Sequence, residues 1–175
     1  MGRVFGVDST GSPQALTIRQ ARDDELDIVA SLTVDAYAEY AARMSPDAWS
    51  SFAQDIANVR GRLGDAHVLI AERSGHIVGS VSVYTDWRGA QAGSFGVRLL
   101  AVPPQHRGQG VGRALMEHAL DWAKSSGVSR VVMLLTPDME SARELSEELG
   151  FSRDQGLDHE PAPGVRMQGY ALSVS

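Results

Sequence analysis

Cysteine is absent from this chain of 175 residues. Without thiols, the protein has no disulfides, no thiolate metal ligands and no cysteine nucleophile, and such a composition suits a reducing compartment. Long apolar runs are also missing, because no window reaches the roughly 18 uninterrupted apolar residues of a membrane-spanning helix. We therefore expect a cytoplasmic protein with no membrane partner.

Basic residues are in the minority, with 16 Lys and Arg against 22 Asp and Glu, a net charge of −6 and a pI near 5.3. This acidic balance repels nucleic acid, which is not an expected partner. Hydrophobic residues make up 43% of the chain, an ordinary globular mixture. We expect a flexible tail over residues 1–14 and one domain over residues 15–175.

Hydrophobic periodicity predicts the order of the elements. Three strands, joined in part by the hairpin signal Ser74-Gly75, form an antiparallel meander, and later strands alternate with helices. This order predicts an α+β fold with a central mixed sheet of about seven strands and flanking helices. The expected strands are 15–19, 67–73, 76–85, 94–102, 130–136 and 168–175; the expected helices are 23–42, 46–62, 108–126 and 138–149; residues 154–165 are expected to form a loop.

A glycine-rich segment lies between the strand at 94–102 and the next helix. It reads Gln105-His106-Arg107-Gly108-Gln109-Gly110-Val111-Gly112-Arg113. Backbone N–H groups and the helix dipole converge at such a helix start, and the glycines let an anion approach without an obstructing Cβ. The segment therefore predicts a pyrophosphate site.

Acidic residues are missing from Trp87 to Met116, although the chain as a whole is acidic. The same stretch contains Arg88, Arg98, Arg107 and Arg113. Two other phosphate motifs do not fit. A dinucleotide fingerprint needs a glycine where Arg113 stands, and a Walker loop needs Gly-Lys-Ser/Thr. Nucleotide binding is thus the least favoured alternative.

The motif Arg107-x-x-Gly110-x-Gly112, preceded by Leu100-Ala101-Val102-Pro103, resembles the acetyl-CoA signature of the GNAT superfamily of N-acyltransferases. The resemblance extends to Ala142-x-x-Leu145 and Gly150-Phe151, and the order of elements from about residue 15 to 174 also agrees. It implies that pyrophosphate sits on the turn and that the pantetheine arm pairs with the strand. The implied acetyl-CoA contacts are Leu100, Ala101, Val102, Arg107, Gly108, Gln109, Gly110, Val111, Gly112, Arg113, Met139 and Ala142.

The strand before the turn carries a signal of its own. Phe95, Val97 and Leu99 share one face by period two, and the apolar pattern then shifts to Leu100 and Val102. A β-bulge causes such a shift, and it would free backbone groups for an extended ligand. We expect the N–H of Leu100 or Val102 to polarise the thioester carbonyl.

The catalytic residues of the family do not carry over, so they stay unknown. Gly96 stands where an acidic side chain is expected, Ser146 stands at the position of a tyrosine acid, and Met139 replaces a common asparagine. Asp158-His159-Glu160 is read as a solvated loop and not as a metal site. The hydroxyls of Tyr37, Tyr40, Tyr84 and Tyr170 are read chiefly as parts of the core.

The resulting hypothesis is an N-acetyltransferase that passes the acetyl group of acetyl-CoA to a primary amine of a small molecule or peptide by direct attack. The alternative is a non-catalytic acyl-CoA-binding sensor or partner-binding module, as the departures at Gly96 and Ser146 suggest. By family analogy, residues 23–42, 46–62 and 154–165 line the acceptor pocket. The acceptor itself, the use of longer acyl-CoAs and the oligomeric state, a homodimer included, stay open.

Overall fold

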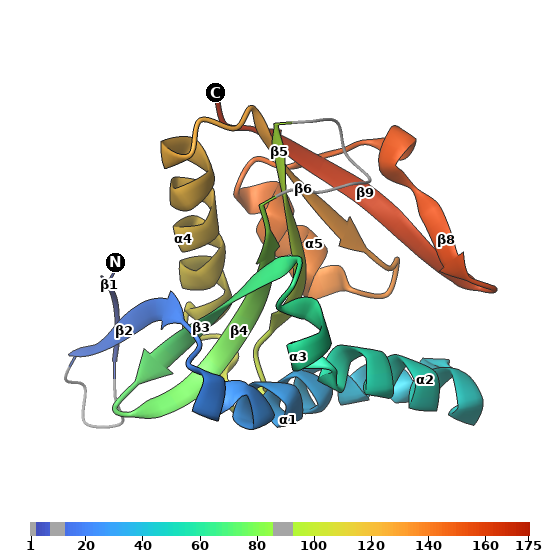
Figure 1. Cartoon of the computed structure of the whole chain (residues 1–175), viewed down its shortest axis with the longest axis horizontal. Helices are drawn as coiled ribbons and strands as arrows, with labels where there is room; N and C mark the ends of the chain where they lie inside the picture. Colours follow the sequence, from blue (N-terminus) through green and yellow to red (C-terminus); the bar gives the residue numbers. More distant parts are fainter. Residues whose placement is uncertain (1–2, 8–12, 86–92) are drawn as a thin grey trace. The chain divides into compact units, whose positions relative to one another are not determined.

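The computed structural model describes residues 3–7, 13–85 and 93–175 of the chain (Figure 1). The residues group into two compact units. The first unit comprises Met1–Ser82 and Leu99–His118, and the second comprises Val83–Arg98 and Ala119–Ser175. The chain passes between the units within β4 (His76–Tyr84), β5 (Ser94–Ala101) and α4 (Val111–Ser125). The single domain expected for residues 15–175 stays a prediction.

In the first unit, β1 (Arg3–Val7), β2 (Pro13–Gln20), β3 (Ala66–Arg73) and β4 are neighbours in that order, and the end of β5 follows β4. The β1 strand pairs antiparallel with β2, from Arg3↔Thr17 to Val7↔Pro13. A tail was expected here. The short run Arg-Val-Phe-Gly-Val contains β-branched and aromatic residues that favour a strand once a partner is present. Residues 1–2 and 8–12 of the expected tail lie outside the described residues.

The hairpin between β3 and β4 has the predicted geometry. Ser74 and Gly75 have φ angles of 52° and 79°. Positive φ at both central residues defines the type I′ turn, whose twist matches that of paired strands. The hairpin signal in the sequence is therefore confirmed.

The helices of the first unit are shorter than the sequence pattern suggests. The segment expected at 23–42 is α1 (Leu26–Tyr37), flanked by the 3-10 turns η1 (Asp23–Glu25) and η2 (Ala38–Arg43). The segment expected at 46–62 divides into α2 (Pro46–Ala57) and α3 (Val59–Arg62). The division occurs at Asn58, whose side chain accepts the N–H of Gly61 at 3.1 Å and caps α3.

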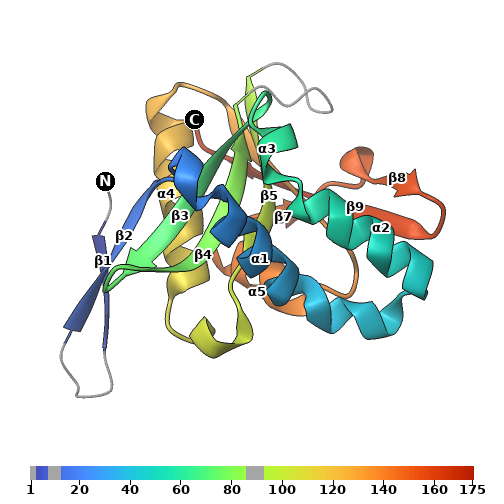
Figure 2. The same cartoon turned by 60° about the horizontal axis from the view of Figure 1, so that its bottom comes forward.

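Figure 2 shows α1 and α2 side by side. Ser45 caps α2, because its hydroxyl accepts the N–H of Ala48 at 3.1 Å and Pro46 follows at the first helical position. The helices and strands share one apolar cluster, in which every member is at most 2% exposed. Its members are Leu26, Val29, Val59, Val68 and Ile70.

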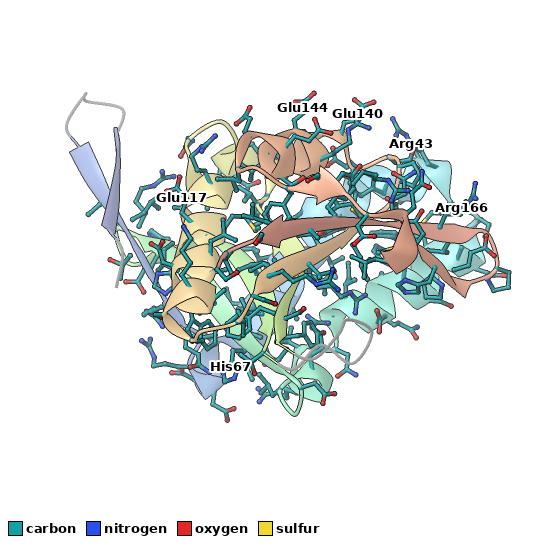
Figure 3. The ribbon with its side chains drawn as sticks, turned by 90° about the horizontal axis from the view of Figure 1, so that it is seen from above. Arg43, His67, Glu117, Glu140, Glu144 and Arg166 are labelled. Atoms are coloured by element: carbon teal, nitrogen blue, oxygen red, sulfur yellow. The ribbon has the colours of Figure 1, made fainter. Side chains whose placement is uncertain are left out.

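In the second unit, β5, β6 (Arg130–Leu135), β9 (Val165–Ser173) and β7 (Ser152–Arg153) are neighbours in that order. The β5 and β6 strands run parallel, as a helical crossover such as α4 requires, and β6 pairs antiparallel with β9. Every residue of β6 after Arg130 is buried, as its continuous apolar run predicts. Helix α5 (Glu140–Glu148) follows β6, and Glu140 and Glu144 point away from the ribbon (Figure 3).

The prediction of a loop over residues 154–165 is wrong. This segment forms η4 (Gln155–Leu157) and β8 (His159–Ala162), and β8 makes a hairpin with β9 through a turn that contains Gly164 at φ 79°. Two prolines suggested a loop, but proline is tolerated on an edge strand. Arg153 holds the segment, because both oxygens of Asp158 accept from its guanidinium at 2.6 Å.

Strands of both directions flanked by helices confirm the mixed α/β class. Over residues 3–7, 13–85 and 93–175, no helix is long and apolar enough to cross a membrane.

A charged network fixes the start of α1 against the strands of the first unit. Arg19 of β2 donates to both oxygens of Glu25, at 2.8 and 2.7 Å, and its Nε donates to Glu72 of β3 at 3.1 Å. The N–H of Arg22 also donates to Glu25, at 2.8 Å. Glu25 is only 7% exposed, and these donors, Arg19 above all, lower its pKa from 4.5 to about 2. The ionised carboxylate therefore stabilises the folded state.

Replacing Glu25 by glutamine should destabilise the protein by about 1.5–3 kcal/mol at pH 7, because charge-assisted hydrogen bonds are lost. The folded-state pKa is depressed, so this stabilisation is complete above pH 4.5 and is lost as the pH falls towards 2. Urea unfolding at pH 6 and pH 3 should show the gap between wild type and Glu25→Gln narrowing at pH 3. Asp24→Asn, at an exposed side chain, is the control. An equal gap at both pH values would contradict this role of Glu25.

Candidate functional site

The glycine-rich turn joins β5 to α4 through a short 3-10 turn, η3 (Pro104–His106). Gly108 and Gly110 have φ angles of 74° and 80°, in the left-handed region that favours glycine. A Cβ built at either position would meet no atom within 4 Å. Glycine is thus required by the backbone angles, and the space beside both residues is open. A ligand can reach the backbone here.

The turn ends at the positive end of a long helix. The N–H of Ala114 donates to the carbonyl of Gly110 at 3.0 Å, so the helical hydrogen bonds of α4 begin at Gly110. The first N–H groups of an α-helix have no acceptor within it, and the helix dipole adds partial positive charge there. Residues Arg107 to Gly110 are exposed. This arrangement is suited to an anion such as a phosphate.

The helix start is anchored by close packing within the first unit. Val111 and Leu115 are at most 1% exposed. A Cβ on Gly79 of β4 would come within 2.7 Å of Cγ1 of Val111 and 3.1 Å of Cδ1 of Leu115. The absence of a side chain at Gly79 therefore lets α4 approach β4 and fixes the position of the turn.

Arg107 connects the turn to the end of α1. Its Nε donates to the carbonyl of Val102 at 2.9 Å, and its other nitrogens donate to the carbonyl of Ala36 at 2.9 Å and to Glu39 at 3.1 Å. Its own N–H donates to the carbonyl of Pro104 at 3.3 Å. The side chain thus holds α1 and β5 together. The N–H groups after Arg107 are better placed to receive an anion.

The other predicted residues of the turn differ in their surroundings. Gln109 is exposed between the two left-handed glycines, and Gly112 lies in the first turn of α4. The guanidinium of Arg113 lies 3.5 Å from Glu117, which is labelled on α4 in Figure 3. Burial, together with Arg73 and His76, lowers the pKa of His106 below 6.5. At neutral pH, His106 therefore adds little positive charge to the turn.

The break predicted in the strand before the turn is present. Leu99 has a φ of 56°, in the left-handed region that a strand residue other than glycine rarely adopts. The parallel register of β5 with β6 spans Ser94↔Arg130 to Val97↔Met133, before this residue. The carbonyl of Leu100 accepts the hydroxyl of Tyr37 at 3.0 Å. Leu100, Ala101 and Val102 follow this break and precede the turn, and their contact with the pantetheine arm stays a prediction.

Met139 and Ala142 belong to the second unit, at the start of α5. Met139 precedes the helix and is 7% exposed, and Ala142 is partly exposed. Gly96 is buried in β5 and pairs with Val132. Ser146 is 1% exposed, and its hydroxyl donates to the carbonyl of Arg143 at 2.7 Å. Its proton is therefore used within α5.

Asp158 and Tyr170, two further candidates from the sequence, have structural partners. Asp158 pairs with Arg153 and also accepts the N–H of Gly169 at 2.8 Å, and these donors lower its pKa to about 2. Such a carboxylate is a poor base. Tyr170 is 5% exposed and packs against the guanidinium of Arg153. Tyr37 is 7% exposed, so its reading as part of the core is confirmed, and its hydroxyl also donates to the carbonyl of Leu100.

The family model described as the acetyltransferase (GNAT) family matches residues 26–151. Among curated proteins, a mycothiol acetyltransferase of Propionibacterium freudenreichii is 28% identical over 93% of this chain and 52% of its own length. A mycothiol acetyltransferase of Thermobispora bispora is 34% identical over half of this chain and 30% of its own length. The chain therefore spans about half or less of the length of these two relatives.

The fold is similar to that of solved acetyltransferases. An N-acetyltransferase from Thermoplasma acidophilum in complex with coenzyme A matches 90% of this chain and 98% of its own, with a TM-score of 0.70 and 14% identity. A GNAT family acetyltransferase from Brucella melitensis in complex with acetyl-CoA matches 91% of this chain and 88% of its own, with a TM-score of 0.63 and 20% identity. At these identities, the match shows the fold.

Proposed function

Because the chain belongs to the acetyltransferase (GNAT) family, we propose that it is an N-acetyltransferase that uses acetyl-CoA and a primary amine of a small molecule or peptide. The observation that carries the proposal is the open turn at Gly108 and Gly110, which leads into the positive end of α4. The similar structures solved with coenzyme A or acetyl-CoA support the choice of co-substrate.

We assign the parts of acetyl-CoA to residues of the first unit as follows. The N–H groups from Gly108 to Arg113 would hold the pyrophosphate, and no Cβ obstructs the approach at Gly108 or Gly110. The backbone of Leu100, Ala101 and Val102 would pair with the pantetheine arm after the break at Leu99. Met139 and Ala142 stay predicted contacts from the second unit. Bound acetyl-CoA supplies the acetyl group as a thioester.

The proposed reaction forms a bond between the amine nitrogen and the acetyl carbon and breaks the carbon–sulfur bond. The amine attacks in its neutral form, so an ammonium group first releases one proton to solvent. The attacking amine then loses one further proton, and the departing thiolate of coenzyme A gains one. An N–H of the Leu100–Val102 strand would stabilise the charge on the carbonyl oxygen. Ser146 is not suited to protonate the thiolate, because its proton is donated to the carbonyl of Arg143. We therefore propose proximity and backbone polarisation as the main sources of rate.

A second function has support from particular residues. Gly96 carries no side chain and Ser146 is engaged within its helix, so neither supplies a general base or acid. A non-catalytic acyl-CoA-binding sensor or partner-binding module would need neither a general base nor a general acid. Cytoplasmic location, the absence of nucleic-acid and membrane partners, and homodimer formation stay predictions from the sequence.

Release of the coenzyme A thiol in the presence of a panel of primary amines tests the proposed function. We expect turnover of at least one amine.

We also expect acetyl-CoA to raise the melting temperature more than adenosine does, because affinity should reside in the pyrophosphate and pantetheine contacts. Stabilisation by acetyl-CoA without turnover of any amine would favour the sensor, and equal stabilisation by adenosine would count against the site.

Gly110→Asp should abolish stabilisation by acetyl-CoA with little loss of fold, because a carboxylate would enter the predicted anion site at a helix start. Gly164→Asp is a matched control. Gly164 also has a positive φ of 79°, and its Cβ would also meet nothing within 4 Å, so both variants carry similar backbone strain. Thermal unfolding with and without acetyl-CoA compares the two. Equal stabilisation of both variants would contradict the assignment.

A further inference from the structure

Four aromatic side chains form a continuous strip on the helices of the first unit. The ring centroids of Tyr37 and Tyr40 are 5.8 Å apart, those of Tyr37 and Phe52 are 6.0 Å apart, and those of Phe52 and Trp49 are 6.1 Å apart. These rings are tilted or edge-on to each other, the arrangements that aromatic pairs prefer. The strip, defined by these four residues, joins α1 and η2 to α2.

The strip is not wholly core. Tyr37 is 7% exposed, but Tyr40, Trp49 and Phe52 are each partly exposed. Single exposed aromatics on a protein surface need no explanation, whereas a contiguous set leaves apolar surface in contact with water. A ligand that covered this surface would gain the free energy of its burial.

The strip reaches the strand that we assign to the pantetheine arm. The hydroxyl of Tyr37 donates to the carbonyl of Leu100 at 3.0 Å, so one end of the strip touches the backbone that precedes the turn. Arg107 binds Ala36 and Glu39 in the same part of the chain. The end of α1 is thus fixed to both predicted cofactor-binding segments. The ring of Phe52 lies beside that of Tyr37, and the ring of Trp49 lies beside that of Phe52.

Acidic residues outnumber basic ones along the segment that carries the strip, although Arg107 balances the charge of Glu39. Residues 35–57 contain Asp35, Glu39, Asp47 and Asp55 against the single base Arg43, and these side chains are exposed. Arg43 is labelled in Figure 3. A local excess of carboxylates attracts a cationic amine. An aromatic cage for an ammonium group would need rings around one centre, but these rings follow each other in a row.

We propose that Tyr40, Trp49 and Phe52 receive the apolar part of the acceptor, and that the acceptor is a cationic amine with an aromatic or branched apolar substituent. The proposal rests on the proposed N-acetyltransferase function and specifies its substrate class. The carboxylates attract the ammonium group, and the rings bury the substituent. An amine without such a group leaves the strip exposed to water and binds more weakly.

The test compares phenylethylamine with ethylamine and with spermidine in the thiol-release assay. Wild type should have a kcat/KM for phenylethylamine about tenfold or more above those of the other two amines, since burial of a phenyl ring contributes that much. Trp49→Ala should raise the KM for phenylethylamine about tenfold and leave the KM for acetyl-CoA unchanged. Trp49→Phe should restore most of the affinity, and Gln20→Ala, at an exposed position on β2 outside the segments expected to line the acceptor pocket, should have no effect.

Equal kcat/KM values for all three amines, or a preference for spermidine, would overturn the aromatic assignment and leave the acetyltransferase function intact. A calorimetric titration of phenylethylamine into the protein with coenzyme A decides the matter even without turnover. Binding that is weakened by Trp49→Ala and kept by Gln20→Ala would support the strip as a binding surface. No binding, or equal binding to both variants, would overturn it. Self-association is the other outcome that would overturn the proposal. If the apparent molecular mass in solution rises with protein concentration, and Trp49→Ala abolishes this rise, the strip binds a second copy of the chain.

Discussion

The conformation of two glycines is the constraint on which the candidate site depends. The chain leaves β5 and begins α4 within a few residues, with positive φ at Gly108 and Gly110. Gly79 on β4 also contributes, because it has no side chain and therefore lets Val111 and Leu115 of α4 pack against the strand. The same residue type thus shapes the turn and holds the helix that follows.

Two side chains connect the turn and the strand before it to the end of α1 in the first unit. Arg107 joins the turn to the carbonyl of Ala36 and to Glu39, and Tyr37 joins the same end of α1 to the carbonyl of Leu100. A carbonyl near a helix end has no partner within the helix, so a guanidinium there is well suited to cap it. The segment that carries the aromatic strip is therefore attached to the segment that we assign to acetyl-CoA.

Sequence patterns that span only a few residues predicted much of the fold. Ser74-Gly75, the apolar run of β6 and the shift after Leu99 each depend on a few adjacent residues, and each is present in the structure. The strands β1 and β8 were missed because each contains a glycine or proline, which disfavour strands, although each pairs with a strand close by in the sequence. The contacts of Tyr37 with Leu100 and of Arg107 with Ala36 were not predicted for a different reason, since these partners lie 63 and 71 residues away in the sequence.

The most direct test of the central claim is a crystal structure of this protein with acetyl-CoA. The account predicts pyrophosphate oxygens about 3 Å from N–H groups between Gly108 and Arg113, and the pantetheine arm along Leu100, Ala101 and Val102. A pyrophosphate bound elsewhere, with the N–H groups of the turn facing only water, would contradict it.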